Sequence, residues 1–497
     1  MAKDGSLSAP VVEREEGRPF IDRYQERAEL DDAWSSGRPE LVVVHGRRRV
    51  GKSTLLARFA AGRAVTYDVA AEQLERDQLA DLGRALSPFA IGPVGGRAPG
   101  LAIHDWDEAL SIAAEAASRR RIGLVLDEFP YLVAGNAALP SLLQRWWDAV
   151  GSRLNVVLVL SGSQQSMMRS LVSAEGALYG RPTRAIHLRP FDDYHAGRFA
   201  TRWSPEDRVR LYAVAGGVPD YLEEFDASRP LRDELLRLAF SPAGRLFREA
   251  PDLLRSEFVE PRTYETVLRA MARGSMTPGE IAAQAGLAGA NRVAPYLERL
   301  IDLDLVERRV PPPEVGLPRS RNSQYIVADQ YLRFYFALID PWRNAIQQGQ
   351  GAAVLEGTWG EELDRFVSRA FEVVARQHFQ RLAGTGAVGP FSTVGFWWFN
   401  GGGIDAAALA GSRLAAARTA KWTREHLKPA DVAGLRRDCA TVAPGDKPRL
   451  FAYSRSGFDR HLDAESDVTL VGLRDLFAPG LEDERARTAG VGRQGGA

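Results

Sequence analysis

The residues best suited to chemistry in this chain lie in a short loop between Gly46 and Ser53. The loop has the pattern G-x-x-x-x-G-K-S, after an apolar run at 42–44 and before a helix-like run at 55–59. Glycines let backbone N–H groups face an anion, a helix N-terminus adds partial positive charge, and Lys52 can reach terminal phosphates. A surface turn would rarely carry this pattern, which arises by chance about once in tens of thousands of positions. The sequence therefore predicts a phosphate-binding loop.

A pair of acids, Asp127 and Glu128, ends a second apolar run at 122–126. Asp127 can hold Mg²⁺ through water, with Ser53 as a further ligand, and Glu128 can orient and deprotonate the attacking water. Paired acids after a strand also serve as helix caps, but their combination with the loop favours catalysis. Lys52 and Glu128 are thus predicted catalytic residues. The predicted nucleotide contacts in the loop are Gly46, Arg47, Arg48, Arg49, Val50, Gly51, Lys52, Ser53 and Thr54.

Two further polar residues flank predicted strands. Ser161 follows an apolar run at 155–160, and it could sense the terminal phosphate because neighbouring parallel strands end at one crevice. A plain Ser-Gly-Ser turn is the alternative. Arg181 precedes a strand at 184–188 and could neutralise charge on a transferring phosphoryl group, either in its own subunit or from a neighbouring one. The second possibility would require a homo-oligomer.

Alternating strands and helices position these residues. Helical spacing at 71–86 and 105–121 separates the strands, which predicts a doubly wound parallel α/β sheet. We place the chain's parts at 1–19 (mobile tail), 20–192 (P-loop ATPase domain), 193–262 (helical lid), 263–330 (winged helix-turn-helix), 331–480 (small α/β domain) and 481–497 (mobile tail).

The amino-acid composition indicates the class of protein but does not indicate its binding partner. The 497 residues contain 64 Lys plus Arg and 64 Asp plus Glu, so the overall charge indicates no particular partner. Cys439 is the single cysteine, which excludes an intrachain disulfide and favours a reducing, cytoplasmic environment. Because no apolar run reaches about 18 residues, we expect no membrane span.

The winged helix-turn-helix prediction rests on helical pieces at 264–272, 278–285 and 294–303 and on strands at 306–310 and 324–327. The third helix and its ends carry more acid than base, so their charge predicts weak binding to DNA. The acids are Glu298, Asp302 and Asp304, and the bases are Arg292 and Arg299. The predicted wing offers Arg308, Arg309, Arg319 and Arg321. Contact with DNA through the wing and a purely internal packing role both remain open.

Together these motifs resemble the archaeal-type ATPase family, among the AAA-like, STAND-type P-loop proteins. The residues that carry the resemblance are 20–30, the phosphate loop, Leu-Asp-Glu-Phe-Pro-Tyr-Leu at 126–132, Leu-Tyr-Gly-Arg at 178–181 and Gly-Gly-Val-Pro-Asp-Tyr-Leu at 216–222. The resemblance implies ATP as the nucleotide and contacts to it from Gly217 and Pro219. The absence of an N-K-x-D or T-K-x-D guanine-reading element also favours ATP.

The C-terminal part resembles the domain of unknown function that accompanies this ATPase, itself similar to restriction-endonuclease-like nucleases. Such nucleases hold magnesium with an acid on one strand and a Glu-x-Lys on the next. Asp405 and Lys421 match this pattern, and Glu372 is the implied helix acid. Thr419 replaces the glutamate and Gly403 replaces a further acid. A hydroxyl is a poor magnesium ligand, so we expect a degraded nuclease centre.

These observations lead to one main functional hypothesis and two alternatives. The first is a slow, Mg²⁺-dependent ATPase that acts as a nucleotide switch coupled to a DNA-binding-like module. The second is a non-catalytic DNA-binding regulator with structural ATP. The third is an ATP-regulated nuclease.

Overall fold

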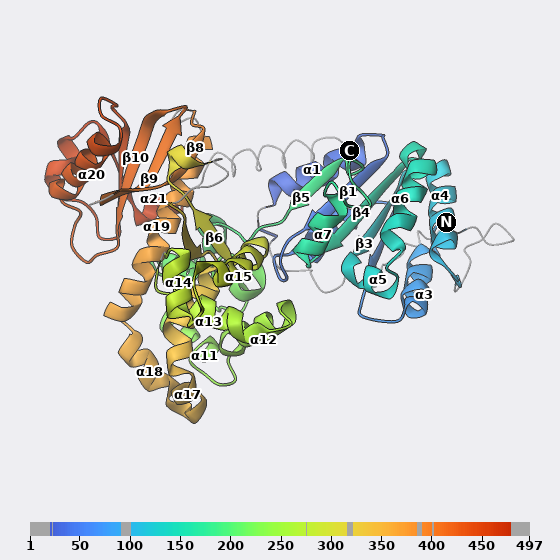
Figure 1. Cartoon of the computed structure of the whole chain (residues 1–497), viewed down its shortest axis with the longest axis horizontal. Helices are drawn as coiled ribbons and strands as arrows, with labels where there is room; N and C mark the ends of the chain where they lie inside the picture. The colour runs from blue at the N-terminus through green and yellow to red at the C-terminus, as the bar shows by residue number, and fades with distance from the viewer. Residues whose placement is uncertain are drawn as a thin grey trace, which may run out of the picture. The chain divides into compact units, whose positions relative to one another are not determined.

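A computed structural model of the chain describes residues 20–21, 23–90, 101–274, 276–315, 322–384, 390–399 and 402–478 (Figure 1). The chain divides into two compact units, Met1–Arg189 and Pro190–Ala497. The predicted tails at 1–19 and 481–497 lie outside the described residues, as do Arg319 and Arg321 of the predicted wing. No helix in the described ranges combines the length and the apolar character that crossing a bilayer would need.

The first unit is built on a five-stranded parallel sheet with the strand order β2-β3-β4-β1-β5, which confirms the predicted α/β class. Its strands are β1 (Glu40–His45), β2 (Val65–Val69), β3 (Ile122–Asp127), β4 (Val156–Gly162) and β5 (Arg184–His187). Its helices are α1 (Tyr24–Ser35), α2 (Lys52–Ala60), α3 (Glu75–Leu86), α4 (Trp106–Arg119), α5 (Phe129–Gly135), α6 (Leu139–Ala149) and α7 (Gln165–Val172).

Alternating strand residues build two cores in this unit, one on each face of the sheet. Along β1, Leu41 and Val43 join a core with α3 to α7, whereas Val42 and Val44 join a core with α1 and α2. This period of two is the geometry of a strand buried on both faces. It fixes which strand residues face α2, the helix that begins at the phosphate loop.

The second unit contains a five-stranded mixed sheet and a two-stranded pair. The large sheet has the order β12-β11-β10-β9-β8, with β8, β9 and β10 antiparallel and β10, β11 and β12 parallel. Its strands are β8 (Thr393–Phe399), β9 (Gly402–Ala410), β10 (Arg413–Lys421), β11 (Arg449–Ser454) and β12 (Val468–Gly472). The pair is formed by β6 (Val306–Arg309) and β7 (Gln324–Val327), which run antiparallel.

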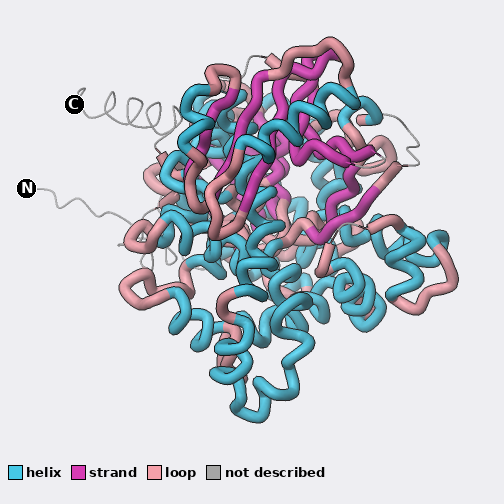
Figure 2. The backbone as a smooth tube through the Cα atoms, turned by 90° about the vertical axis from the view of Figure 1, so that its left-hand side faces the viewer, coloured by secondary structure: helices cyan, strands magenta, loops and turns pink. Residues whose placement is uncertain are grey.

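Helices make up most of the second unit before the large sheet (cyan in Figure 2). They are α8 (Asp193–Gly197), α9 (Pro205–Ala215), α10 (Pro219–Leu222), α11 (Leu231–Leu238), α12 (Arg245–Glu257), α13 (Pro261–Met271), α14 (Pro278–Gln284), α15 (Ala290–Asp302), α16 (Gln330–Phe334), α17 (Arg343–Ala345), α18 (Gly351–Thr358) and α19 (Glu361–Gly384). Helices α20 (Pro429–Val442) and α21 (Leu473–Leu476) accompany the sheet. One core runs from Phe191 to Leu476, so the segments predicted as lid, winged helix and C-terminal domain share it.

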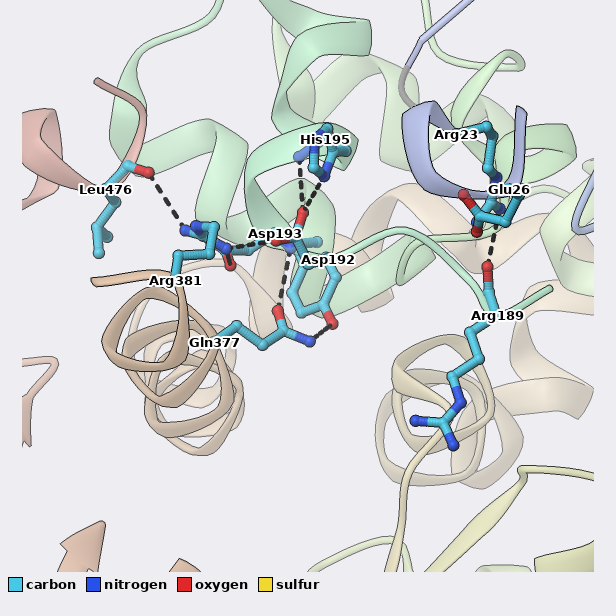
Figure 3. A network of polar contacts seen from close by, with 10 residues as sticks. Arg23, Glu26, Arg189, Asp192, Asp193, His195, Gln377, Arg381 and Leu476 are labelled. Carbon is cyan, nitrogen blue, oxygen red and sulfur yellow. Dashed lines mark hydrogen bonds and ion pairs between the residues drawn. The ribbon is translucent and has the colours of Figure 1, made fainter. Parts of the chain in front are cut away.

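A buried ionic cluster joins the start of this unit to its longest helix (Figure 3). Arg381 on α19 donates to both Asp192 and Asp193 at the start of α8, and Gln377 accepts from the Asp193 backbone N–H at 3.0 Å. Burial raises the pKa of Asp193 to about 6, although Arg381 opposes that shift. Burial acts in the same direction on Asp192, but His195 and Arg381 hold its pKa below the usual range. The cluster therefore depends on Arg381.

Replacing Arg381 by Met should destabilise the second unit by about 3 kcal/mol at pH 7, because Asp193 would be left buried without its cation. Without Arg381 the pKa of Asp193 rises further above its unfolded value. The variant should then regain stability as the pH falls from 7 to 5, since its folded state binds the extra proton. Urea unfolding at both pH values measures this, with Arg365→Met at an exposed position of the same helix as control. Equal losses in the two variants would contradict the role assigned to the cluster.

Candidate nucleotide-binding site

The predicted loop connects β1 to α2, as a phosphate-binding loop requires. Gly46 lies so close to the neighbouring backbone that a Cβ there would stand 2.3 Å from the Leu188 carbonyl oxygen. Arg49 and Gly51 both have left-handed backbones, with φ of 70° and 91°. Glycine adopts this conformation without cost, whereas arginine does not. The strand, loop and helix context predicted for residues 46–51 is present.

Lys52 lies across the loop with only 4% of its surface exposed. Its Nζ donates to the carbonyl oxygens of Gly46 at 3.0 Å and Arg47 at 3.1 Å. Phosphate oxygens are stronger acceptors for an ammonium than neutral carbonyls. Lys52 can therefore exchange these bonds for phosphate contacts through its side chain alone.

The neighbouring arginines of the loop differ in their surroundings. Arg47 is buried, Arg49 is exposed, and Arg48 donates from Nη2 to the Tyr131 hydroxyl at 2.8 Å. Arg48 thus connects the loop to α5, which follows the acid pair. The three arginines are not one exposed basic cluster.

Ser53 and Asp127 meet, although they are 74 positions apart in the sequence. The Ser53 hydroxyl donates to Asp127 Oδ2 at 2.7 Å, and the Glu128 backbone N–H donates to Oδ1 at 3.0 Å. The Asp127 side chain is fully buried, at 0% exposure. One hydroxyl and one carboxylate fit a magnesium ion that takes its remaining ligands from phosphates and water.

Glu128 is held in a constrained position beside this pair. Its φ is 51°, a left-handed value that costs a non-glycine residue free energy. Its Oε2 accepts from the Ser163 hydroxyl at 2.9 Å and from the Ser163 backbone N–H at 3.2 Å. A carboxylate at the end of β3 is thereby joined to the residue that follows β4.

Ser163, not Ser161, is the serine that contacts the acid pair. Ser161 lies within β4 at 0% exposure, and its Oγ has no hydrogen-bond partner among the described residues. The predicted phosphate-sensing role of Ser161 stays a prediction. The strand reaches Gly162, two residues beyond its expected end, which places Ser163 at the crevice.

Tyr67 is a site residue that sequence reasoning missed. It lies on β2, beside β3, and its hydroxyl donates to Asp127 Oδ2 at 2.8 Å. Burial and the nearby Asp127 raise the pKa of the Tyr67 hydroxyl well above its usual value, so it remains a donor. No local sequence pattern marks Tyr67, because its contact with Asp127 depends on β2 lying beside β3.

Arg181 lies at the edge of the sheet where β1 begins, whereas the phosphate loop of the same subunit lies where β1 ends. It precedes β5, and the adjacent Thr183 backbone N–H donates to Leu41 near the beginning of β1. Its guanidinium binds Asp148 through two bonds of 2.8 and 2.7 Å. The loop follows the other end of β1, on the order of 15 Å away at about 3.3 Å per residue. Arg181 therefore does not reach the loop of its own subunit in this arrangement. Action on a neighbouring subunit stays a prediction.

Gly217 and Pro219 belong to the second unit, where local packing already explains the glycine. A Cβ on Gly217 would stand 1.8 Å from the Phe191 carbonyl oxygen, and the Gly217 carbonyl accepts from the Phe191 N–H at 2.7 Å. Pro219 is the first residue of α10. Their predicted contacts with the nucleotide stay predictions.

The residues of the implied nuclease centre line one cavity of about 550 Å³. Glu372, Asp405 and Lys421 all border it, with Thr419 and Gly403 at the two replaced positions. Burial and Asp405 raise the pKa of Glu372, while the Asp405 carboxylate accepts from the Ala420 backbone N–H at 3.0 Å. Lys421 lies 3.5 Å from Asp431. With a hydroxyl at Thr419 and no side chain at Gly403, this lining lacks two of the acids that the resemblance implies, and the degraded nuclease centre stays a prediction.

The two arginines of the predicted wing that the structure describes, Arg308 and Arg309, lie in different environments. Arg308 is exposed and donates to Ser323 at 2.9 Å. Arg309 binds Glu307 at 3.0 Å with 14% of its side chain exposed. Burial opposes ionisation of Glu307, but Arg376 and Arg309 lower its pKa to about 2. Arg309 thus has an internal role, so at this position the structure favours the packing alternative.

Comparison with known proteins agrees with this geometry. Residues 20–225 match a family described as an ATPase domain predominantly from Archaea, and residues 335–433 match one described as archaeal and bacterial proteins of unknown function. The uncharacterized protein MJECL04 of Methanocaldococcus jannaschii is 30% identical over 423 residues, covering 84% of this chain and 90% of that protein.

Two solved structures are among those that match this chain. The Walker-type ATPase PABY2304 of Pyrococcus abyssi has 21% identity and a TM-score of 0.48, covering 64% of this chain and 96% of that chain. The ORC2 protein of Aeropyrum pernix, in ADPNP–ADP complexes, has 15% identity and a TM-score of 0.40, covering 67% and 97%. On its family matches and on the relative that it covers to 90%, this chain belongs to the archaeal-type ATPase family, and in this chain the ATPase match precedes the match to proteins of unknown function.

Proposed function

We propose that this protein is a slow, Mg²⁺-dependent ATPase that acts as a nucleotide switch coupled to a winged-helix, DNA-binding-like module. The observation that carries the proposal is the convergence of Lys52, Ser53, Asp127 and Glu128 at one end of the parallel sheet. Ser53 Oγ lies 2.7 Å from Asp127 Oδ2, and Glu128 is the next residue in the chain after Asp127. Their residue types match the requirements of phosphoryl transfer to water.

Each of these residues has a distinct task. The loop N–H groups and Lys52 bind and orient the phosphates, and Ser53 and Asp127 would hold the metal ion. Bound magnesium supplies charge neutralisation at the phosphates. Glu128 orients water and accepts its proton, provided that its carboxylate turns away from Ser163. Because two hydrogen bonds from Ser163 hold the Glu128 carboxylate, turnover is expected to be slow.

A short polar connection supports the switch. Arg23 is buried, and its Nη2 donates to the Val50 carbonyl in the phosphate loop at 3.0 Å. The same Nη2 donates to the Arg189 carbonyl at 2.8 Å (Figure 3). Arg189 is the last residue of the first unit. A change in the loop on nucleotide binding therefore has a direct route to the end of that unit. A ligand shifts such an equilibrium only through differential contacts, which terminal phosphate and magnesium provide.

The catalytic assignment predicts different effects for two variants. Glu128→Gln should lower ATP hydrolysis by about 100-fold or more while retaining ATP affinity, because only the proton acceptor is lost. Lys52→Ala should lose ATP affinity itself, because a buried cation for the phosphates is removed. Phosphate release and equilibrium ATP binding measure the two effects. Equal, background-level phosphate release from wild type and Glu128→Gln would favour the alternative, a non-catalytic DNA-binding regulator with structural ATP.

The wing predicts where DNA would be contacted. Arg308→Ala should weaken DNA binding uniformly across sequences and reduce the salt slope by about one, as expected for loss of one phosphate contact. Arg58→Ala on α2, in the first unit, is the matched control and should leave binding unchanged. Binding is measured by fluorescence anisotropy at several salt concentrations. If Arg308→Ala binds DNA as the wild type does, the wing is not a DNA contact.

The altered donor set of the C-terminal cavity predicts no magnesium-dependent nuclease activity in the wild type. A carboxylate is missing at both Thr419 and Gly403. Incubation of labelled single- and double-stranded DNA with Mg²⁺ or Mn²⁺ should give no cleavage. Cleavage that Asp405→Ala and Lys421→Ala both abolish would reverse this and support the ATP-regulated nuclease.

A further inference from the structure

Tyr67 stands out because a tyrosine from an edge strand reaches the predicted magnesium residues. Its hydroxyl donates to Asp127 Oδ2 at 2.8 Å and lies 3.4 Å from the Ser53 backbone carbonyl. It therefore touches both sides of the predicted ion site. None of the roles assigned so far accounts for it.

The hydrogen bonds to Asp127 divide unequally between its two oxygens. Oδ1 accepts from the Glu128 backbone N–H, which a side-chain motion leaves in place. Oδ2 accepts from both Ser53 and Tyr67, at 2.7 and 2.8 Å. A carboxylate oxygen offers about two lone-pair directions for such bonds. Both directions at Oδ2 are thus taken by protein hydroxyls.

We propose that Tyr67 is a positioning residue that competes with the hydration shell of magnesium for Asp127 Oδ2. The proposal rests on the proposed function, since it assumes that Ser53 and Asp127 hold the ion. Asp127 Oδ2 is the oxygen beside Ser53, so it must release Tyr67 before it accepts a hydrogen bond from the ion's water. Without nucleotide, Tyr67 keeps the buried carboxylate hydrogen-bonded and sets a threshold for magnesium.

The position of Tyr67 on an edge strand explains how its hydrogen bond to Asp127 can break and form again as Mg²⁺ binds and leaves. Tyr67 lies on β2, an edge strand paired only with β3 in the sheet order. Its ring is partly buried against the α2 side, which keeps the hydroxyl near Asp127 after the bond is broken. Only a side-chain rotation or a small shift of an edge strand is needed.

Tyr67→Phe removes the competing hydroxyl while keeping the ring. The variant should need about tenfold less Mg²⁺ for half-maximal binding of a fluorescent ADP analogue, the size expected for one hydrogen bond to a charged group. Its ADP affinity in EDTA should equal that of the wild type. Tyr179→Phe, at an exposed tyrosine of the same unit, is the matched control and should leave both values unchanged.

Thermal unfolding in EDTA and in Mg²⁺ with ADP provides a second readout. The magnesium-dependent rise in melting temperature should occur at lower Mg²⁺ in Tyr67→Phe, whatever the variant's stability in EDTA. An unchanged or higher Mg²⁺ requirement would overturn the competition while leaving the proposed function intact. Absence of any magnesium effect on ADP binding by the wild type would overturn both.

Discussion

The site depends on one buried carboxylate. Asp127 ends β3 with no exposed surface, and its described hydrogen-bond donors, Ser53, Tyr67 and the Glu128 N–H, are all neutral. A buried charge is costly unless hydrogen bonds or a cation compensate it. Three donors supply the first kind of compensation, and a metal ion would supply the second. The cation at this position belongs to the proposed function, and the sheet supplies the three neutral donors.

Strand order determines which residues can serve Asp127. Because β3 lies between β2 and β4, the first neighbour brings Tyr67 and the second brings Ser163 to the acid pair. Strand β1, beyond β4, carries the loop and Ser53. Three strands from separate parts of the chain thus converge on two consecutive acids. This is the crevice at the carboxyl ends of parallel strands.

The sequence was sufficient for the loop and the acids because their information is local. A glycine pattern followed by a helix, and acids at the end of an apolar run, carry their own structural context. Tyr67 was not predictable in this way, because its contact depends on β2 being the neighbour of β3. Arg181 is a different case. Its place before a parallel strand already put it at the edge opposite the loop, so strand direction would have excluded a role at that loop.

The alternation of side chains along β6 explains why Arg308 and Arg309 of the predicted wing differ in their surroundings. Arg308 and Arg309 are equivalent in a count of charges, yet adjacent strand residues face opposite sides. Arg309 shares its side with Glu307, which also binds Arg376 of α19 at 3.1 Å. Of the two described arginines in the predicted wing, Arg309 therefore belongs to an internal ion cluster and Arg308 does not. The side of the strand that carries this cluster is set by its contact with α19. The spacing of residues in the sequence gives no information about that contact.

Within the proposed function, the arrangement of Glu128 suits a nucleotide switch better than a fast ATPase. Two hydrogen bonds to a carboxylate contribute about 1.5–3 kcal/mol each, and a left-handed backbone costs about 1–3 kcal/mol. These opposing contributions leave a difference of a few kcal/mol between the held and released states, within the range that differential phosphate contacts can invert. The Val50 carbonyl, in the same loop, is tied through Arg23 to Arg189. Release of the acid and movement at the end of the first unit can therefore respond to the same ligand.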